Sequence, residues 1–380
     1  MSKLGIGLIG CGNIAMTYLR NARLFAGLEP RACADALPAQ AALRAKQYGV
    51  RACTVEALLA DREIDLVLNL TVPAAHHDVT LAALAAGKHV FTEKPLALSA
   101  EAGQELVAEA KARGLALGSA PDTFLGAAGR LARQLVDGGA IGRVVTGTAF
   151  MMGRGMEHWH PNPAFYYQAG AGPVLDMGPY YLTMLVNLLG PATRVMAMGT
   201  SGSEERVITA PGPLHNTRFK PETPTSVLSL IEFASGAIIT FGASWDVHRH
   251  SNANIELHGT EGSLRLPDPD TFGGTVSLSR RGDGWEAVDT ADRVYGAINW
   301  PYEQPDRANY RMLGVADLAA AVAAGRSPRA SGSLALHVLD ILAAILRSGE
   351  NGEAVDIATS VDQPPVLQED EAAAFLARTP

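Results

Sequence analysis

The chain has 380 residues, of which 47% are hydrophobic and 18% are charged, and its formal net charge is −8. This length is typical of two domains, and the composition is typical of a soluble protein with an ordinary core. The acidic balance argues against a general nucleic-acid-binding protein. No apolar run approaches the roughly 20 residues that span a membrane, so we expect no membrane partner.

The cysteine content and the start of the sequence indicate the cellular compartment of the protein. The three cysteines are odd in number and lack metal-site spacing, which is typical of reduced thiols in a cytoplasmic protein. A predicted strand begins almost at the N-terminus, so we expect no signal peptide. We therefore predict a cytoplasmic protein.

A strand, a glycine turn and a helix are predicted at the start of the chain. A short apolar run ends at Gly10 to Gly12, and a helical pattern follows over residues 13–25. The turn reads Gly-x-Gly-x-x-Ala, a variant of the dinucleotide-binding fingerprint, in which Gly12 lets the backbone approach a pyrophosphate and Ala15 lets the helix pack on the strand. The N–H groups at the helix start would hold the anion. The predicted cofactor-binding residues of this turn are Gly10, Gly12, Asn13 and Ile14.

An acidic residue at the end of the next apolar segment indicates which dinucleotide binds. Asp35 lies about 20 residues past the glycine turn, where an acid meets the adenosine ribose hydroxyls. A carboxylate there would repel the extra phosphate of NADP. We therefore predict NAD as the cofactor, with NADP less favoured.

Strands and helices alternate through the first 122 residues. The predicted strands lie at 64–70, 89–92 and 115–118, and the predicted helices at 39–48, 76–86 and 99–113. This alternation indicates an α/β Rossmann domain over residues 1–122, with a parallel sheet covered by helices on both faces. Ligands of such sheets bind at the carboxyl ends of the strands, which is where the glycine turn, Asp35, residues 69–73 and residues 93–95 fall.

From residue 123 the pattern changes to that of a second domain, 123–380, of α+β class. A helix is predicted at 124–136 and closing helices at 313–324 and 334–347, and strands are predicted at 144–150, 226–233, 237–243, 254–258, 263–266 and 275–279. Polar and apolar residues alternate in several strands, which indicates a large, mostly antiparallel open sheet. The segment 237–241 is apolar on both faces, so we expect a homodimer or homotetramer formed through this sheet. Residues 200–225 and 282–306 are predicted to be long surface loops.

Four stretches together resemble one enzyme family. Residues 85–96, Ala-Ala-Gly-Lys-His-Val-Phe-Thr-Glu-Lys-Pro-Leu, closely resemble the signature of the Gfo/Idh/MocA oxidoreductases. Thr71-Val72-Pro73 with His76 is similar to the family's loop after the fourth strand. Residues 170–178 resemble its Gly-Gly-Gly…Asp-x-Gly element, and residues 255–262 resemble a strand pair of its second sheet.

The resemblance implies hydride transfer between NAD(P) and a hydroxyl-bearing carbon of a sugar, inositol or glycoside. It implies that Lys94 lies beside the nicotinamide as the acid/base group and that the Lys94–Pro95 bond is cis. Burial beside a cationic nicotinamide would lower the pKa of Lys94 towards neutrality. The resemblance also places Thr71, Pro73, His76 and Glu93 among the cofactor-binding residues.

Asp176 and Tyr180 complete the predicted catalytic set. Asp176 is expected just before a helix N-terminus, which favours its charged form. Much of the family carries a His four residues after this Asp, whereas this chain has Tyr180. A phenol needs a cationic neighbour such as Lys94 to act as a base at neutral pH. Either Tyr180 relays the proton, or Lys94 transfers it and Tyr180 orients the hydroxyl.

An aromatic stretch upstream is the candidate wall of a sugar site. The stretch comprises residues 156–163 and 165–167, in which His158, Trp159 and His160 offer ring faces and hydrogen-bonding groups. The resemblance places Asp122 at the same cleft. The two histidines have i, i+2 spacing, but no cysteine completes a familiar metal set, so we expect no metal. The substrate-binding prediction comprises Lys94, Asp122, His158, Trp159, His160, Asp176 and Tyr180.

Three functions agree with this sequence. The first is an NAD-dependent dehydrogenase, or the reverse carbonyl reductase, for a sugar-like substrate. The second is a transient-redox enzyme that cleaves or isomerises a sugar and recycles tightly bound NAD. The third is a non-catalytic dinucleotide sensor.

Overall fold

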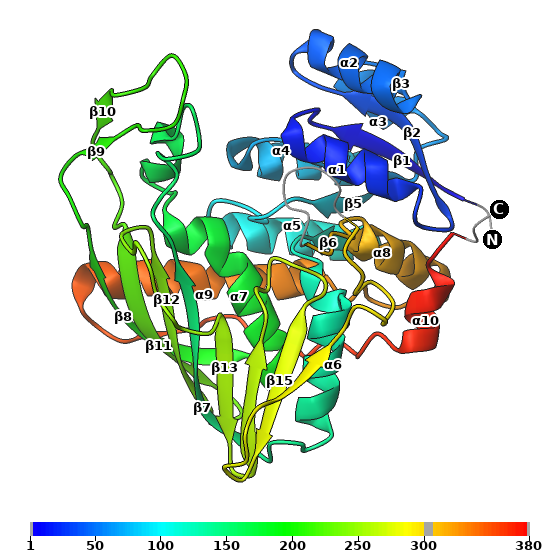
Figure 1. Ribbon diagram of the computed structural model, residues 1–380. Coiled ribbons are helices and arrows are strands. Elements are labelled where there is room, and N and C mark those ends of the chain that lie inside the picture. Colours follow the sequence, from blue (N-terminus) through cyan, green and yellow to red (C-terminus); the bar gives the residue numbers. More distant parts are fainter. Residues whose placement is uncertain (1–2, 300–306, 378–380) are drawn as a thin grey trace.

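The computed structural model describes residues 3–299 and 307–377, and its first part is built on a six-stranded parallel sheet (Figure 1). The strand order is β3-β2-β1-β4-β5-β6. The strands are β1 (Leu4–Ile9), β2 (Leu28–Ala34), β3 (Arg51–Ala52), β4 (Leu66–Asn69), β5 (His89–Thr92) and β6 (Leu117–Ser119). The predicted parallel Rossmann sheet is confirmed.

Helices cover both faces of this sheet because its central strands are apolar on both sides. Leu66 and Leu68 of β4 belong to one hydrophobic cluster, while Val67 between them belongs to another. Side chains alternate across a strand, so each cluster lies on its own face. The covering helices are α1 (Asn13–Ala22), α2 (Pro38–Tyr48), α3 (Val55–Ala60), α4 (His76–Ala85) and α5 (Ala100–Ala112).

The second sheet has nine strands in the order β16-β15-β14-β13-β7-β12-β11-β8-β17. Within this sheet, among the described residues, only the β7–β12 pair is parallel. The strands are β7 (Val144–Met152), β8 (Ala192–Thr200), β11 (Ser226–Phe233), β12 (Ile238–Ser244), β13 (Ile255–Gly259), β14 (Gly262–Leu266), β15 (Thr275–Arg280), β16 (Glu286–Asp289) and β17 (Val355–Asp356). The predicted second, mostly antiparallel sheet is confirmed.

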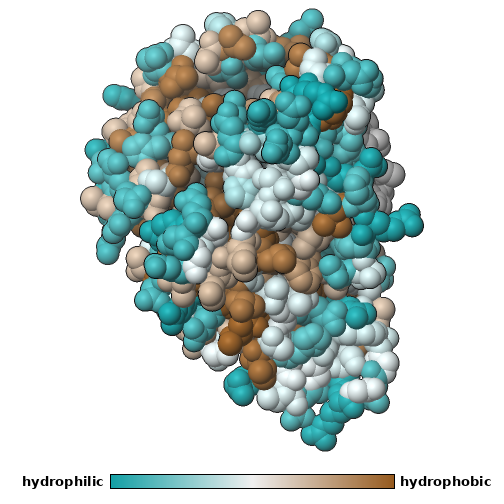
Figure 2. Space-filling view, turned by 90° about the vertical axis from the view of Figure 1, so that its left-hand side faces the viewer, coloured by the Kyte–Doolittle hydropathy of each residue, from teal (hydrophilic) through white to brown (hydrophobic). Residues whose placement is uncertain are grey.

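One face of the large sheet is covered and the other is open. Helices α7 (Pro173–Leu189) and α9 (Gly332–Asn351) lie against the covered face, and α6 (Ala127–Asp137) packs on β14 and β15 (Figure 1). In β11, Val227 and Ile231 are buried, whereas Leu228 and Leu230 are 54% and 50% exposed. Figure 2 shows hydrophobic residues gathered on this side of the molecule.

Helix α9 is long and apolar enough to cross a membrane by length and composition alone. In the structure, 61% of its most apolar stretch is buried. It packs against β8, α7 and α5, so it joins the large sheet to the parallel sheet. Its apolar character is therefore explained by its place in the core.

Several elements differ from the sequence-based expectation. The 200–225 loop contains the hairpin of β9 (Arg206–Val207) and β10 (Arg218–Phe219), and the 282–306 loop contains β16, while residues 300–306 lie outside the described residues. Strands β8 and β17 were not predicted, nor was α10 (Glu369–Ala374). β9, β10 and β17 have only two residues each, too few for a periodic pattern. Helix α8 (Leu313–Ala324) was predicted correctly.

Candidate active site

The glycine turn between β1 and α1 has the shape of an anion site. A Cβ at Gly10, whose φ is +99°, would lie 2.5 Å from the backbone of Leu70. Gly12 has an ordinary φ of −69°, and a Cβ there would meet nothing within 4 Å. No side chain caps α1, and Asn13, its first residue, is exposed and is followed by the half-buried Ile14. The open space before uncapped N–H groups fits a dinucleotide pyrophosphate.

Two side chains hold this turn in place. One Asp35 carboxylate oxygen accepts a hydrogen bond from the Cys11 N–H at 2.7 Å, and the other accepts from the Leu37 N–H at 2.8 Å. The buried Arg44 of α2 donates to the carbonyl of Cys11 at 3.2 Å. Asp35 therefore lies at the end of β2 beside the turn, where the sequence places it. Arg44 was missed because no local motif marks it.

The loop after β4 is tied to the turn after β5 by a buried histidine. The two ring nitrogens of His76 lie 2.6 Å from the carbonyl of Pro95 and 3.0 Å from the carbonyl of Thr71. Pro73 begins the short helix η1 (Pro73–Ala75) and is exposed. Thr71 and Pro73 are thus positioned at the strand ends, while His76 is buried and holds their loop against Pro95.

Glu93 connects the same edge to α1. The Tyr18 hydroxyl donates to one Glu93 carboxylate oxygen at 2.8 Å, and the Lys94 backbone N–H donates to the other at 3.0 Å. The Lys94–Pro95 peptide bond is cis. Glu93 therefore has both oxygens engaged by protein groups directly beside Lys94.

Lys94 meets Asp176 where the two sheets adjoin. The Lys94 ammonium lies 3.1 Å from a carboxylate oxygen of Asp176 and 2.5 Å from its backbone carbonyl oxygen. Asp176 lies in the first turn of α7, which begins at Pro173, and Pro179 lies inside the helix. The expected position just before the helix is wrong by one turn, because the proline is accommodated within α7. The acid still lies at the positive end of the helix dipole.

The environment of Lys94 favours its charged form. Burial alone would lower the pKa of Lys94, but the charges of Asp176 and Glu93, the nearby Tyr180 phenol and the hydrogen bond to Asp176 outweigh it. The pKa of Lys94 therefore lies above its ordinary value, not near neutrality as expected from burial. A lysine with a raised pKa is protonated at neutral pH, so Lys94 can act as a proton donor.

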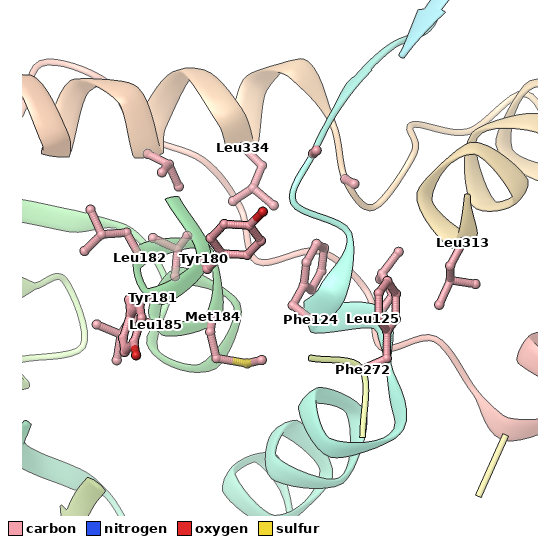
Figure 3. Packing of buried hydrophobic residues seen from close by; sticks show 14 of the residues in the cluster. Phe124, Leu125, Tyr180, Tyr181, Leu182, Met184, Leu185, Phe272, Leu313 and Leu334 are labelled. Carbon is pink, nitrogen blue, oxygen red and sulfur yellow. The ribbon is translucent and has the colours of Figure 1, made fainter. Parts of the chain in front are cut away.

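Tyr180 lies beside this ion pair. Its ring centroid is 5.4 Å from the Lys94 ammonium, and the residue is only 8% exposed. The ring belongs to the main hydrophobic cluster, with Phe124, Leu313 and Leu334 from other elements (Figure 3). Burial and the charge of Asp270 raise the pKa of Tyr180 to about 12, although nearby cations lower it. Tyr180 is thus also protonated at neutral pH.

Four aromatic rings upstream of α7 contact one another. His160 makes edge contacts with Trp159, Phe165 and Tyr166, with ring centroids 5.3 to 5.5 Å apart. Trp159 is 55% exposed. Burial raises the pKa of Tyr166, the Asp176 charge raises it further and the Lys94 charge lowers it. Tyr166 was not among the predicted site residues, although it lies in the aromatic stretch.

His158 and Asp122 lie in different surroundings. His158 is exposed and lines a cavity of about 410 Å³ with Arg206 and Trp245. Asp122 is 1% exposed, and its carboxylate accepts a hydrogen bond from the Gly314 N–H at 2.8 Å. Asp122 is therefore not open to a ligand and instead joins the parallel sheet to α8. Among the described residues, no group of three or more His, Cys, Asp or Glu could hold a metal ion.

Comparison with known proteins identifies two family domains. Residues 4–120 match the oxidoreductase family model with an NAD-binding Rossmann fold, and residues 130–265 match the GFO/IDH/MocA C-terminal domain. A 1,5-anhydro-D-fructose reductase of Ensifer adhaerens is 27% identical over 362 residues, covering 93% of this chain and 99% of that protein. A levoglucosan dehydrogenase of Pseudarthrobacter phenanthrenivorans is 28% identical over 290 residues, 70% and 73% of the two chains.

A solved structure agrees with the sequence comparisons. Levoglucosan dehydrogenase in complex with NADH and L-sorbose matches with a TM-score of 0.80 at 25% identity, covering 94% of this chain and 100% of that one. The match spans both sheets. The chain therefore belongs to the Gfo/Idh/MocA family and is an oxidoreductase with an NAD-binding Rossmann domain.

Proposed function

We propose that the protein transfers a hydride between NAD and a secondary alcohol or ketone of a sugar, polyol or glycoside. The observation that carries this proposal is the contact of Lys94 with Asp176, formed at the carboxyl edge of the parallel sheet that also holds the glycine turn. The relatives named for 1,5-anhydro-D-fructose and levoglucosan support a sugar-like substrate. When bound, NAD supplies the hydride acceptor for the alcohol.

The protein groups provide the remaining chemistry. In our proposal Lys94 hydrogen-bonds the reacting oxygen through its ammonium, and Asp176 holds that ammonium in place. Tyr180 offers a second proton beside it. Because the pKa values of Lys94 and Tyr180 are both raised, the site favours proton donation to a carbonyl oxygen. Oxidation requires one of them to lose its proton first.

The substrate would lie between this pair and the aromatic group. We propose that the ring faces of Trp159 and Phe165, both exposed, contact a sugar and that the Tyr166 hydroxyl donates to one of its hydroxyl groups. His160 completes this wall through its ring contacts, whereas we assign His158 no place in it because it lines another cavity with Arg206 and Trp245. We assign Asp122 no direct contact with substrate, because its carboxylate is buried against Gly314.

The proposed cofactor contacts lie along the carboxyl edge of the parallel sheet. We propose that Gly10, Gly12, Asn13 and Ile14 hold the pyrophosphate, that Asp35 contacts the adenosine ribose, and that Thr71, Pro73, His76, Glu93 and Lys94 shape the nicotinamide end. The Asp35 carboxylate uses one lone pair of each oxygen on backbone N–H groups, which leaves further lone pairs for ribose hydroxyls.

We also propose that two copies of the chain pair through the open face of the large sheet. Met196, Met198, Leu228 and Leu230 are 51%, 79%, 54% and 50% exposed on neighbouring strands β8 and β11. A contiguous apolar face of this kind is typical of a subunit interface. Leu230→Asp should lower the mass measured by light scattering to that of a monomer, whereas an unchanged mass would reject this interface.

A sugar panel tests the function. The purified protein is mixed with NAD or NADP and with sugars, polyols and glycosides, and NADH formation is followed by absorbance while binding is followed by calorimetry. We expect NADH formation with at least one sugar-like alcohol. Binding of dinucleotide and sugar without NADH formation would indicate a sensor, and turnover with retained NAD and no added cofactor would indicate the transient-redox enzyme.

A further inference from the structure

A buried arginine lies directly on the phenol of Tyr180. The Arg311 guanidinium donates a hydrogen bond to the Tyr180 hydroxyl at 3.2 Å, and it lies 5.9 Å from the ring centroid. The same Arg311 nitrogen lies 2.6 Å from a carboxylate oxygen of Asp270. The Arg311 side chain is 12% exposed. It was not among the predicted site residues, because it lies in no motif.

Hydrogen-bond chemistry fixes the direction of the Tyr180 proton. A guanidinium can only donate, so the hydroxyl oxygen must accept the bond from Arg311. The phenol's own proton must then point elsewhere. Among the described residues the Tyr180 hydroxyl has no other hydrogen-bond partner, and the Lys94 ammonium beside its ring also has only protons to offer. The Tyr180 proton is thus left for an acceptor that the described part of the chain does not provide.

Hydrogen bonds from helix α1 hold the backbone at Arg311. The Asn21 side chain of α1 donates to the backbone carbonyl of Arg311 at 3.1 Å and to that of Asn309 at 3.0 Å. Helix α1 begins at the glycine turn, so Arg311 is held relative to the expected pyrophosphate position. Asp270 fixes the other end of the side chain, and its second oxygen lies 3.0 Å from Arg307.

We infer that Arg311 is a positioning residue that, held by Asp270, turns the Tyr180 hydroxyl so that its proton points to the reacting oxygen of the substrate. This inference rests on the proposed function, because it assigns a role within the same site. Arg311 acts through Tyr180, and Asp270 acts through Arg311.

The charges around Tyr180 predict opposite effects of the two positioning groups. The groups facing the phenol are Lys94, Glu93, Asp270 and Arg311, with Asp176 on its own helix and Tyr18 and Asp122 beyond Arg311. Arg311 lowers the pKa of Tyr180, whereas Asp270 raises it. Removing each in turn should therefore move the titration of Tyr180 in opposite directions.

The first test is the pH profile of kcat for alcohol oxidation in Arg311→Met, Arg311→Lys and Asp270→Asn. We expect the rising limb to move up by about one pH unit in Arg311→Met and down in Asp270→Asn, with Arg311→Lys close to wild type. Arg280→Met, an exposed arginine on β15, is the matched control and should not move the profile. Shifts in the same direction, or none, would overturn the inference.

The second test does not depend on activity. A difluorotyrosine placed at position 180 has a lowered phenol pKa, so its titration can be followed by fluorine NMR in the folded protein without substrate. We expect the midpoint to rise in Arg311→Met and to fall in Asp270→Asn. Opposite shifts in a protein with no dehydrogenase activity would reject the proposed function but keep this geometry, whereas an active enzyme without them would reject the role of Arg311 alone. If Arg311→Met does not fold, the test rests on Arg311→Lys, whose midpoint should stay close to wild type, and on Asp270→Asn, whose midpoint should fall.

Discussion

The two sides of the candidate site are built in different ways. At the edge of the parallel sheet, the polar side chains are already engaged by the protein: Asp35 by two backbone N–H groups, His76 by two carbonyl oxygens and Glu93 by Tyr18 and a backbone N–H. On the other side, Trp159 is 55% exposed and Phe165 is 48% exposed.

This difference teaches where each kind of specificity resides. Groups held by several hydrogen bonds keep one geometry and need little ordering when a ligand arrives, as suits a cofactor shared by a whole family. Exposed aromatic side chains leave their contacts to be made by the ligand, as suits a substrate that varies between relatives. Changes on the cofactor side should therefore affect the chemistry, and changes on the aromatic side should affect substrate affinity.

The largest effect is expected at the junction of the two sides. Lys94→Ala removes the group that would hydrogen-bond the reacting oxygen, so kcat should fall by about 1,000-fold. NAD affinity, measured by calorimetry, should remain nearly unchanged because the glycine turn and Asp35 are untouched. Lys111→Ala, at an exposed position on α5, is the control. A rate near that of wild type in Lys94→Ala would reject the assignment.

The pH dependence should be the next largest effect. The pKa values of Lys94 and Tyr180 both lie above their ordinary values, so the basic form of either is scarce at pH 7. Oxidation should accelerate about 100-fold from about pH 7 to 9, tenfold per unit, while carbonyl reduction should not accelerate. Comparing the oxidation profiles of wild type and Tyr180→Phe shows which group accepts the proton: a profile that persists in Tyr180→Phe assigns that role to Lys94.

A smaller effect is expected at the adenosine end of the cofactor. Asp35→Asn keeps a side-chain oxygen near the glycine turn but removes the charge that would repel a 2′-phosphate. The ratio of kcat/KM for NAD over NADP should fall about tenfold, equivalent to ~1.4 kcal/mol. A wild-type preference for NADP would contradict the role proposed for Asp35.

The smallest effect is expected on the aromatic side. Tyr166→Phe removes one neutral hydrogen-bonding group, so the KM for the sugar should rise about fivefold with kcat little changed. Trp285→Ala, an aromatic residue stacked on Arg265 away from the site, is the matched control. A fall in kcat with unchanged KM would show that Tyr166 acts in the chemical step instead.

Local patterns in the sequence were enough to predict the parallel sheet. The glycine turn, the buried strand of β4 and the capped start of α5 at Ser99 each depend on residues adjacent in the chain. For the same reason the resemblance at 85–96 identified Lys94, and the structure places it against Asp176, which is 82 residues away.

The residues that were missed depend on long-range packing. Arg311 meets Tyr180 across 131 positions and Asp270 across 41, and Tyr18 meets Glu93 across 75. No spacing rule links such positions. The raised pKa of Lys94 was missed for a related reason, because it depends on Asp176, Glu93 and Tyr180, which only the folded chain brings together around it.

The most direct test of the central claim follows the hydride itself. The protein is incubated with NAD and with the sugar that gives activity in the panel, deuterated at the reacting carbon. The cofactor is then recovered, and its mass is measured by mass spectrometry. We expect deuterium to move from the sugar carbon to the nicotinamide ring in wild type and to remain on the sugar in Lys94→Ala. Product formation in wild type with all the deuterium lost to water or kept in the sugar, and none on the cofactor, would contradict this claim.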